Sequence, residues 1–201
     1  MKIIDNLLPE SYVAEIEKAF TSPYFPWFSY GGTFAYTQHE REMYKNAVFD
    51  HRTIDSKQFS HAMFIDNKIN SNYFELIKPI FWFLERQEGI VCKDIIRIKS
   101  NFMMKDIEFP SDFYNPPHSD VTNDIGDKAK ILLYYPCDSD GDTFIFNEYS
   151  VEGMLPDRLT EVQRVTPKRG RCVLLDANRF HASSPPRKHD FRIALNMVFY
   201  A

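Results

Sequence analysis

The chain has 201 residues, a length that suits one domain with one substantial core, and a hydrophobic fraction of 44%, which is ordinary for a globular protein. A formal net charge of −4 argues against broad binding to the phosphate backbone of nucleic acid, and three scattered cysteines argue against a disulfide framework or a thiolate zinc site. No apolar run approaches the roughly 18 residues that span a bilayer, and the polar N-terminus is unlike a signal peptide, so we expect a soluble, cytoplasmic protein that avoids membranes.

The first 90 residues are expected to form helices that support the rest of the chain. A short strand and then a helix are predicted at the start, where Pro9 can occupy the first helical turn. A second helix is predicted over residues 71–87, and Pro79 is expected to kink or break it. The aromatic segment 24–30 between them is interpreted as a staple for the core, with a lid over a substrate as the alternative. The apolar stripe of the first helix consists of Val13, Ile16 and Phe20.

From about residue 90 onward the pattern changes from helices to strands. Residues 94–103 alternate polar and apolar side chains, as a strand with two different faces does, because successive side chains of a strand point to opposite sides. The polar face is expected to carry Arg97, Lys99 and Asn101, opposite Ile96, Ile98 and Phe102.

Five more short strands are predicted, separated by turns rich in Pro, Gly and Asp. Their spacing, together with an aromatic content of 15%, predicts a mainly β, α+β fold of the sandwich or jelly-roll type. Because the helices precede the strands, we expect them to pack on one outer face of the β core, within a single domain whose core covers residues 91–201. These strands are predicted at residues 130–135, 143–147, 163–165, 171–176 and 191–200.

Two of the six histidines lie where a metal ligand can project from the end of a strand. His118 and Asp120 are separated by one residue, so on an extended backbone both side chains point the same way and can reach one metal ion. His181 comes much later, just past the predicted strand 171–176. Two histidines and one carboxylate form the facial triad of non-haem iron(II) oxygenases. The alternative for the tripeptide is a surface loop with a histidine and a capping aspartate.

Arg192 is a candidate for binding an anion. It opens the last apolar strand, and alternation places it on one face with Ala194 and Asn196. A guanidinium directed into a barrel is costly unless an anion meets it, and it binds a carboxylate through two hydrogen bonds. The alternative is an exposed arginine at the start of a strand, as we expect for Arg187 in the preceding turn.

The remaining histidines are weaker candidates. His39 and His51 flank a charged run and are expected in a surface loop. His61 is interpreted as a partly buried residue whose ring is hydrogen-bonded. His189 lies in a turn and is the alternative third metal ligand, although it needs a sharp bend to reach the site.

Several motifs in a consistent order resemble the 2-oxoglutarate/iron(II) oxygenase superfamily, in particular its compact prolyl-hydroxylase-like members, some of which are carried by phages. The similarity covers most of the chain, and it is the ordered occurrence of modest motifs that makes it specific. The matching segments are DNLLP (5–9), FPW (25–27), RIKSN (97–101), PHSD (117–120), LLYY (132–135), DGDTFIF (140–146), PKRGRCVLLD (167–176), HAS (181–183) and Arg192.

The resemblance implies a double-stranded β-helix, a jelly-roll or cupin-like barrel, with iron at one mouth. It implies that His118, Asp120 and His181 bind Fe(II), with 2-oxoglutarate as co-substrate, dioxygen as oxidant and ascorbate as an auxiliary reductant. The carboxylate of Asp120 argues against the halogenating members of the family, in which a small residue leaves room for halide.

The resemblance also implies roles for residues beyond the metal ligands. Arg192 would bind the distal carboxylate of 2-oxoglutarate, and Tyr135 would donate its hydroxyl to the same group. Tyr134 competes with Tyr135 for this role, because the strand register is open. Asn101 would contact the co-substrate near the metal. The family's usual Gly-Gly is Gly141-Asp142 here.

The implied activity is a dioxygenase that hydroxylates a protein side chain of the prolyl type or a small molecule. The polar segment 148–163 is interpreted as an excursion that shapes the substrate side. Two alternatives remain: another cupin-like metalloenzyme, such as a zinc hydrolase, and a β-barrel binding module without a metal. The substrate and the oligomeric state do not follow from the sequence.

Overall fold

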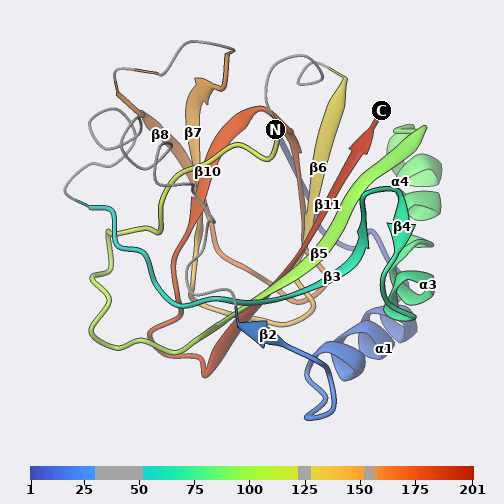
Figure 1. Cartoon of the computed structure of the whole chain (residues 1–201), viewed down its shortest axis with the longest axis horizontal. Coiled ribbons are helices and arrows are strands. Elements are labelled where there is room, and N and C mark those ends of the chain that lie inside the picture. The colour runs from blue at the N-terminus through green and yellow to red at the C-terminus, as the bar shows by residue number, and fades with distance from the viewer. Residues whose placement is uncertain (30–51, 122–127, 152–155, 157) are drawn as a thin grey trace.

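The computed structural model describes residues 1–29, 52–121, 128–151, 156 and 158–201 (Figure 1). Its helices are α1 (Glu10–Phe20), α3 (Tyr73–Ile77) and α4 (Ile80–Glu88). Its strands are β1 (Lys2–Ile4), β2 (Phe28–Ser29), β3 (Phe59–Ile65), β4 (Lys68–Ile69), β5 (Asp94–Met104), β6 (Ala129–Tyr134), β7 (Thr143–Tyr149), β8 (Glu161–Val165), β9 (Cys172–Asp176), β10 (Arg179–Ser183) and β11 (Phe191–Tyr200).

The strands form two antiparallel sheets, which confirms the predicted jelly-roll class. The large sheet has the order β1-β9-β6-β11-β5-β3-β2, with β4 paired to β3, and the small sheet has the order β10-β7-β8. The helices and the small sheet lie on opposite sides of the large sheet (Figure 1). The large sheet therefore has an outer face toward the helices and an inner face toward the small sheet.

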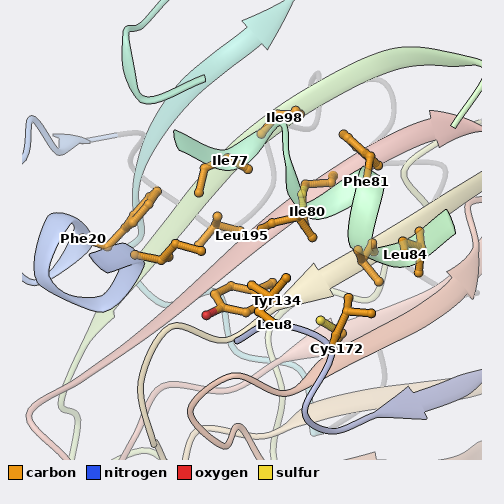
Figure 2. Packing of buried hydrophobic residues seen from close by; sticks show 14 of the residues in the cluster. Leu8, Phe20, Ile77, Ile80, Phe81, Leu84, Ile98, Tyr134, Cys172 and Leu195 are labelled. Carbon is orange, nitrogen blue, oxygen red and sulfur yellow. The ribbon is translucent and has the colours of Figure 1, made fainter. Parts of the chain in front are cut away.

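Alternation along β11 separates two hydrophobic clusters. Ile193, Leu195 and Met197 belong to the cluster that packs under the helices, together with residues of α1, α3 and α4 (Figure 2). Ala194 and Val198 belong to a second cluster on the inner face. The predicted alternation of the last strand is thus confirmed, and so is the predicted packing of the helices on one face.

The second predicted helix is divided at proline, as expected. α3 ends at Ile77 and α4 begins at Ile80, with Pro79 as the residue that precedes its first turn. Proline lacks the N–H that a continuous helix needs at this place. Pro9 likewise precedes α1 rather than lying within it, and its carbonyl accepts hydrogen bonds from Tyr12 and Val13. No helix of the described ranges is long and apolar enough to cross a membrane.

Three features of the strands differ from the prediction. Besides the predicted strand at the start, the first 90 residues also contribute β3 to the large sheet, and β3 pairs with β5. The prediction placed Ile96 on the face of Ile98, but Ile96 packs against the inner cluster. The cause is a β-bulge, because Val198 pairs with Arg97 while the next residue of β11 pairs with Ile95.

The third difference concerns the surroundings of His181. The prediction placed this residue in a turn beyond a strand, whereas it lies within β10, which pairs with β7. The short segment of β10 includes polar and small residues, so its strand character follows from tertiary pairing rather than from its own pattern. His39, His51, Tyr30 and part of segment 148–163 lie outside the described residues.

Candidate metal centre

The backbone brings the three candidate ligands together. His118 and His181 form an isolated antiparallel bridge, in which each N–H donates to the other residue's carbonyl at 2.9 Å. The N–H of Asp120 donates to the carbonyl of Ala177 at 3.0 Å, just before β10 begins. One potential ligand atom from each of the three side chains lies within 4.8 Å of the others. The predicted triad is therefore brought together at one place.

The two imidazoles are oriented by their Nδ1 atoms. Nδ1 of His118 lies 3.1 Å from the Pro116 carbonyl, and Nδ1 of His181 lies 3.1 Å from the Arg179 carbonyl. A protonated Nδ1 donates to such a carbonyl and leaves Nε2 with a lone pair for a metal ion. Burial, followed by the nearby His181, lowers the pKa of His118 to about 3. His118 is thus neutral near pH 7, the form that binds metals.

The carboxylate of Asp120 is held by two strands of the large sheet. Its Oδ1 pairs with Arg97 on β5, and its Oδ2 accepts a hydrogen bond of 2.7 Å from Nδ2 of Asn196 on β11. Burial raises the pKa of Asp120, but Arg97 and the two imidazoles more than offset this effect and hold the pKa well below its usual value. Oδ2 also lies 3.6 Å from Nε2 of His181, so it is the oxygen that faces the other ligands.

Arg192 is buried, with 3% of its surface exposed. Its Nε donates to the carbonyl of Gly141 at 2.8 Å, and its Nη2 donates to Oγ1 of Thr143 at 2.7 Å. Among the described residues no carboxylate lies within ion-pair distance of its guanidinium. Burial lowers the pKa of Arg192. A buried cation whose described partners are neutral is suited to binding an anion.

Gly141 permits this position of the arginine. A Cβ atom at Gly141 would lie 2.5 Å from the carbonyl oxygen of Ser184 and 2.9 Å from Cδ of Arg192. Both distances are too short for real contacts, so any side chain here would displace the guanidinium or the chain beside it. The second residue of the usual Gly-Gly pair is Asp142, which is partly exposed.

The structure brings Tyr135, not Tyr134, to the inner face. The Tyr135 hydroxyl lies 2.7 Å from Oγ1 of Thr143, and Cζ of Arg192 lies 5.7 Å from the centre of its ring. Tyr134 points toward the helices (Figure 2), and its buried hydroxyl has no hydrogen-bond partner among the described residues. Thr143, which sequence reasoning missed, thus connects Tyr135 to Arg192.

One cavity is lined by two of the candidate metal ligands, His118 and His181, and by Arg192. Asn101 also lines it, and its Oδ1 lies 3.4 Å from Nε2 of Gln58. Several residues of this cavity were missed by sequence reasoning, and they share no single motif. Strand alternation does place Lys99 on the face of Asn101 and Asn196 on the face of Arg192, and this pattern was an available signal. The cavity residues that sequence reasoning did not assign to the site are Gln58, Lys99, Leu133, Thr143, Ala182, Ser183, Ala194 and Asn196.

The other histidines of the described residues lie away from this cavity. His189 is exposed, and its Nδ1 lies 2.8 Å from Oδ1 of Asp140. The alternative in which His189 is the third metal ligand is therefore wrong. His61 is buried, and its Nδ1 lies 2.9 Å from the Pro26 carbonyl, whereas its Nε2 has no hydrogen-bond partner in the described ranges. Arg187 is exposed, as predicted.

Comparison with known proteins gives structural matches only. No protein-family model and no curated protein matches the sequence. The epimerase SnoN, in complex with Fe3+, alpha-ketoglutarate and nogalamycin RO, has a TM-score of 0.57 and 13% identity, with 98% of this chain and 77% of that chain covered. HygX from Streptomyces hygroscopicus, with nickel and 2-oxoglutarate bound, has a TM-score of 0.57 and 9% identity, covering 98% and 81%.

A prolyl hydroxylase from Trichoplax adhaerens, in complex with a peptide of hypoxia-inducible factor, has a TM-score of 0.53 and 13% identity, covering 99% of this chain and 82% of that chain. At such identities the likeness concerns the fold. The chain therefore has the jelly-roll fold of the 2-oxoglutarate- and iron-dependent oxygenases.

Proposed function

We propose that the chain is a 2-oxoglutarate- and Fe(II)-dependent dioxygenase. The observation that carries this proposal is a His-Asp-His cluster whose two histidines line the same cavity as Arg192, a buried arginine that has no carboxylate partner among the described residues. A zinc hydrolase can use the same three ligands, but it has no use for a buried cation beside them.

The donor set fits ferrous iron. Two neutral imidazole nitrogens and one carboxylate oxygen are the ligands of the facial triad, and they leave half of an octahedron open for reactants. His118, Asp120 and His181 would supply these donors. Because Oδ1 of Asp120 is paired with Arg97, the carboxylate would bind the metal through Oδ2 alone.

The other end of the cavity offers groups that suit one carboxylate of a dicarboxylate. The guanidinium of Arg192 would bind the distal carboxylate of 2-oxoglutarate and so obtain the anion that its burial requires. Two hydroxyl groups would orient that carboxylate, those of Thr143 and Tyr135. Thr143 accepts a hydrogen bond from Arg192, and Tyr135 is hydrogen-bonded to Thr143. Asn101 would contact the co-substrate nearer the metal.

When bound, the iron and 2-oxoglutarate supply the oxidation of an unactivated C–H bond, coupled to decarboxylation of the keto acid. The protein contributes the placement of the reactants and a site shielded from water, since the side chain of Asp120 is only 2% exposed and that of His181 only 5%. Dioxygen is the second reactant, and ascorbate is the expected auxiliary reductant.

Hydroxylation of a protein side chain of the prolyl type, or of a small molecule, is the proposed outcome. The solved structures that match this chain include an epimerase and a carbocyclase beside a prolyl hydroxylase. This fold thus hosts several outcomes, and the outcome in this chain depends on what its cavity holds next to the metal.

The proposal is tested by adding Fe(II) and 2-oxoglutarate to the protein in the absence of oxygen. The measurement is the visible metal-to-ligand charge-transfer band of the chelate. We expect the band in the wild type, and we expect Arg192→Ala to need about 100-fold more 2-oxoglutarate, because charged hydrogen bonds of a buried group are lost. Arg187→Ala, an exposed arginine near β11, is the matched control and should behave as the wild type. A wild type that binds iron but never develops the band contradicts the proposal.

A further inference from the structure

Lys99 is a cation inside the cavity that neither the proposed iron site nor the keto-acid site uses. It lines the same cavity as His118, His181 and Arg192. No hydrogen bond or ion pair of its ammonium group is found among the described residues. Burial lowers its pKa to about 8, and the repulsion by Arg97 acts in the same direction. A partly buried cation without a partner in a reaction cavity is a typical binding group.

The strand register places Lys99 at the metal end of this cavity. Lys99 pairs with Asn196 of β11, the residue that holds Asp120, whereas Arg192 pairs with Met103, four residues further along β5. The two cations therefore lie at different ends of the same space. On its other side Lys99 pairs with Ala62 of β3.

Charge balance indicates that Lys99 meets an anion other than the co-substrate. With Fe(II) and 2-oxoglutarate bound, the charges of the metal, Asp120, the keto acid and Arg192 cancel. Arg97 and Lys99 then remain as two positive charges next to the metal ligands, with Asp120 as the only described carboxylate near them. Excess charge of one sign in a cleft attracts the opposite sign and is costly without it.

A neighbouring cation on β5 also has a donor without an acceptor among the described residues. Nε of Arg97 is buried and has no hydrogen-bond partner among the described residues, while its Nη2 pairs with Asp120. Arg97 and Lys99 alternate on the same face of β5 and interact electrostatically. Arg97 does not line the cavity, so a carboxylate in it would bind Lys99 and offset the charge of Arg97 from a greater distance.

We propose that the primary substrate carries a carboxylate, which Lys99 binds beside the metal. This inference rests on the proposed function and names its substrate class: an acidic small molecule or an acidic side chain. The competing source of the same chemistry is the keto acid's own metal-bound carboxylate. The metal already neutralises that group, so Lys99 is left for the substrate.

The test compares Lys99→Met, which removes the charge, with Lys99→Arg, which keeps it. Lys68→Met, an exposed lysine on β4, is the control. The band of the anaerobic iron and 2-oxoglutarate complex is recorded first, because its absence counts against the proposed function and not against Lys99. We expect all variants to bind 2-oxoglutarate within about twofold of the wild type, since Lys99 is not assigned to it.

Acid and amide probes are then added in matched pairs: L-aspartate with L-asparagine, L-glutamate with L-glutamine, and blocked glutamyl with blocked glutaminyl peptides. Binding is followed as a change of the band, and turnover as succinate formed after oxygen is admitted. We expect at least one acid to bind about tenfold or more tightly than its amide, the gain typical of a charged hydrogen bond. Lys99→Met should lose this difference, and Lys99→Arg should keep most of it.

Three outcomes would overturn the inference. The first is a loss of 2-oxoglutarate affinity in Lys99→Met as large as that in Arg192→Ala, which would assign the lysine to the co-substrate. The second is equal binding of acids and amides by the wild type. The third is that no acidic probe binds at millimolar concentration to the wild-type complex that shows the band.

Discussion

The two faces of the large sheet use the same strands for opposite purposes. On β11, Ile193, Leu195 and Met197 pack under the helices, where contacts are apolar and non-directional. One residue out of phase, Arg192 and Asn196 face the inner cavity, where each contact is a directed hydrogen bond. Burial is nearly complete on both faces, so exposure does not distinguish the stabilising face from the chemical one.

This division shows how the fold tolerates buried charged groups. Buried polar groups destabilise a protein unless each has a partner, and a cation without an anion is the worst case. The inner face contains Arg192 and Lys99 without described ion-pair partners, whereas the outer face contains the large apolar cluster. We infer that apolar packing on the outer face offsets the cost of the buried charges on the inner face while no ligand is bound.

The largest effect is expected from a change on the inner side. Asp120→Ala should abolish 2-oxoglutarate turnover and lower the metal content of the purified protein, because a facial triad without its carboxylate loses both a donor and a negative charge. Metal analysis and succinate formation measure this. Asp176→Ala removes a carboxylate that pairs with Lys130 away from the cavity and should retain both properties. Retained succinate formation in Asp120→Ala would count against the assignment.

The outer face is tested by Leu195→Ala. Leu195 is fully buried under the helices, so its truncation should lower the free energy of unfolding by about 3 kcal/mol, the usual cost of a buried leucine with its cavity. Denaturant unfolding of the metal-free protein measures it. Asn196→Ala, the next residue on the opposite face, should cost less, about 2 kcal/mol, as expected for one hydrogen bond to a charged carboxylate. Equal losses in the two variants would contradict the division between the faces.

Arg97 orients the candidate metal ligand Asp120. It pairs with Oδ1 of this carboxylate, and we expect Arg97→Met to weaken binding of Co(II) or Mn(II) by about tenfold, the lower range for loss of a group that orients a ligand. Arg97→Lys keeps the charge and should restore part of the affinity. Titration of the metal without co-substrate measures this directly. Unchanged metal affinity in Arg97→Met would show that Asp120 is positioned by Asn196 alone.

The sequence was most informative where a regular period decides which side chains share a face. The alternation along β11 predicted Arg192, Ala194 and Asn196 on one side, and the spacing of His118 and Asp120 predicted their convergence. Proline chemistry predicted the division of the second helix. Each of these features depends on neighbours along the chain, and local rules therefore suffice.

What could not be predicted depends on tertiary pairing. The predicted face of Ile96 was wrong because the pairing of β5 with β11 contains a β-bulge. The strand β10 was not predicted because it depends on pairing with β7. Thr143 belongs to the site only because the small sheet packs over the large one and brings its hydroxyl to Arg192. The choice of Tyr135 over Tyr134 required the register of β6, which the sequence left open.

The smallest effect concerns His61, on the outer side of the large sheet among aromatic rings. Phe25 and Tyr73 lie near its ring, and burial lowers its pKa, with a smaller opposite effect from the Pro26 carbonyl. The unfolded chain, whose histidine has the ordinary pKa near 6.5, then binds a proton that the folded chain does not. Stability contributed by the neutral ring is complete above about pH 6.5 and falls, by at most about 1.4 kcal/mol per pH unit, as the pH drops below it.

His61→Gln should remove this part of the pH dependence while leaving the inner face intact. Unfolding of the metal-free wild type and of the variant, compared between pH 7.5 and pH 5, measures the difference, and the buried His118 contributes equally to both proteins. The variant is expected to lose less stability on acidification than the wild type, because its amide side chain does not titrate. Parallel pH curves would mean that His61 is protonated to the same extent in the folded and the unfolded chain, and the acid sensitivity would then belong to the inner face alone.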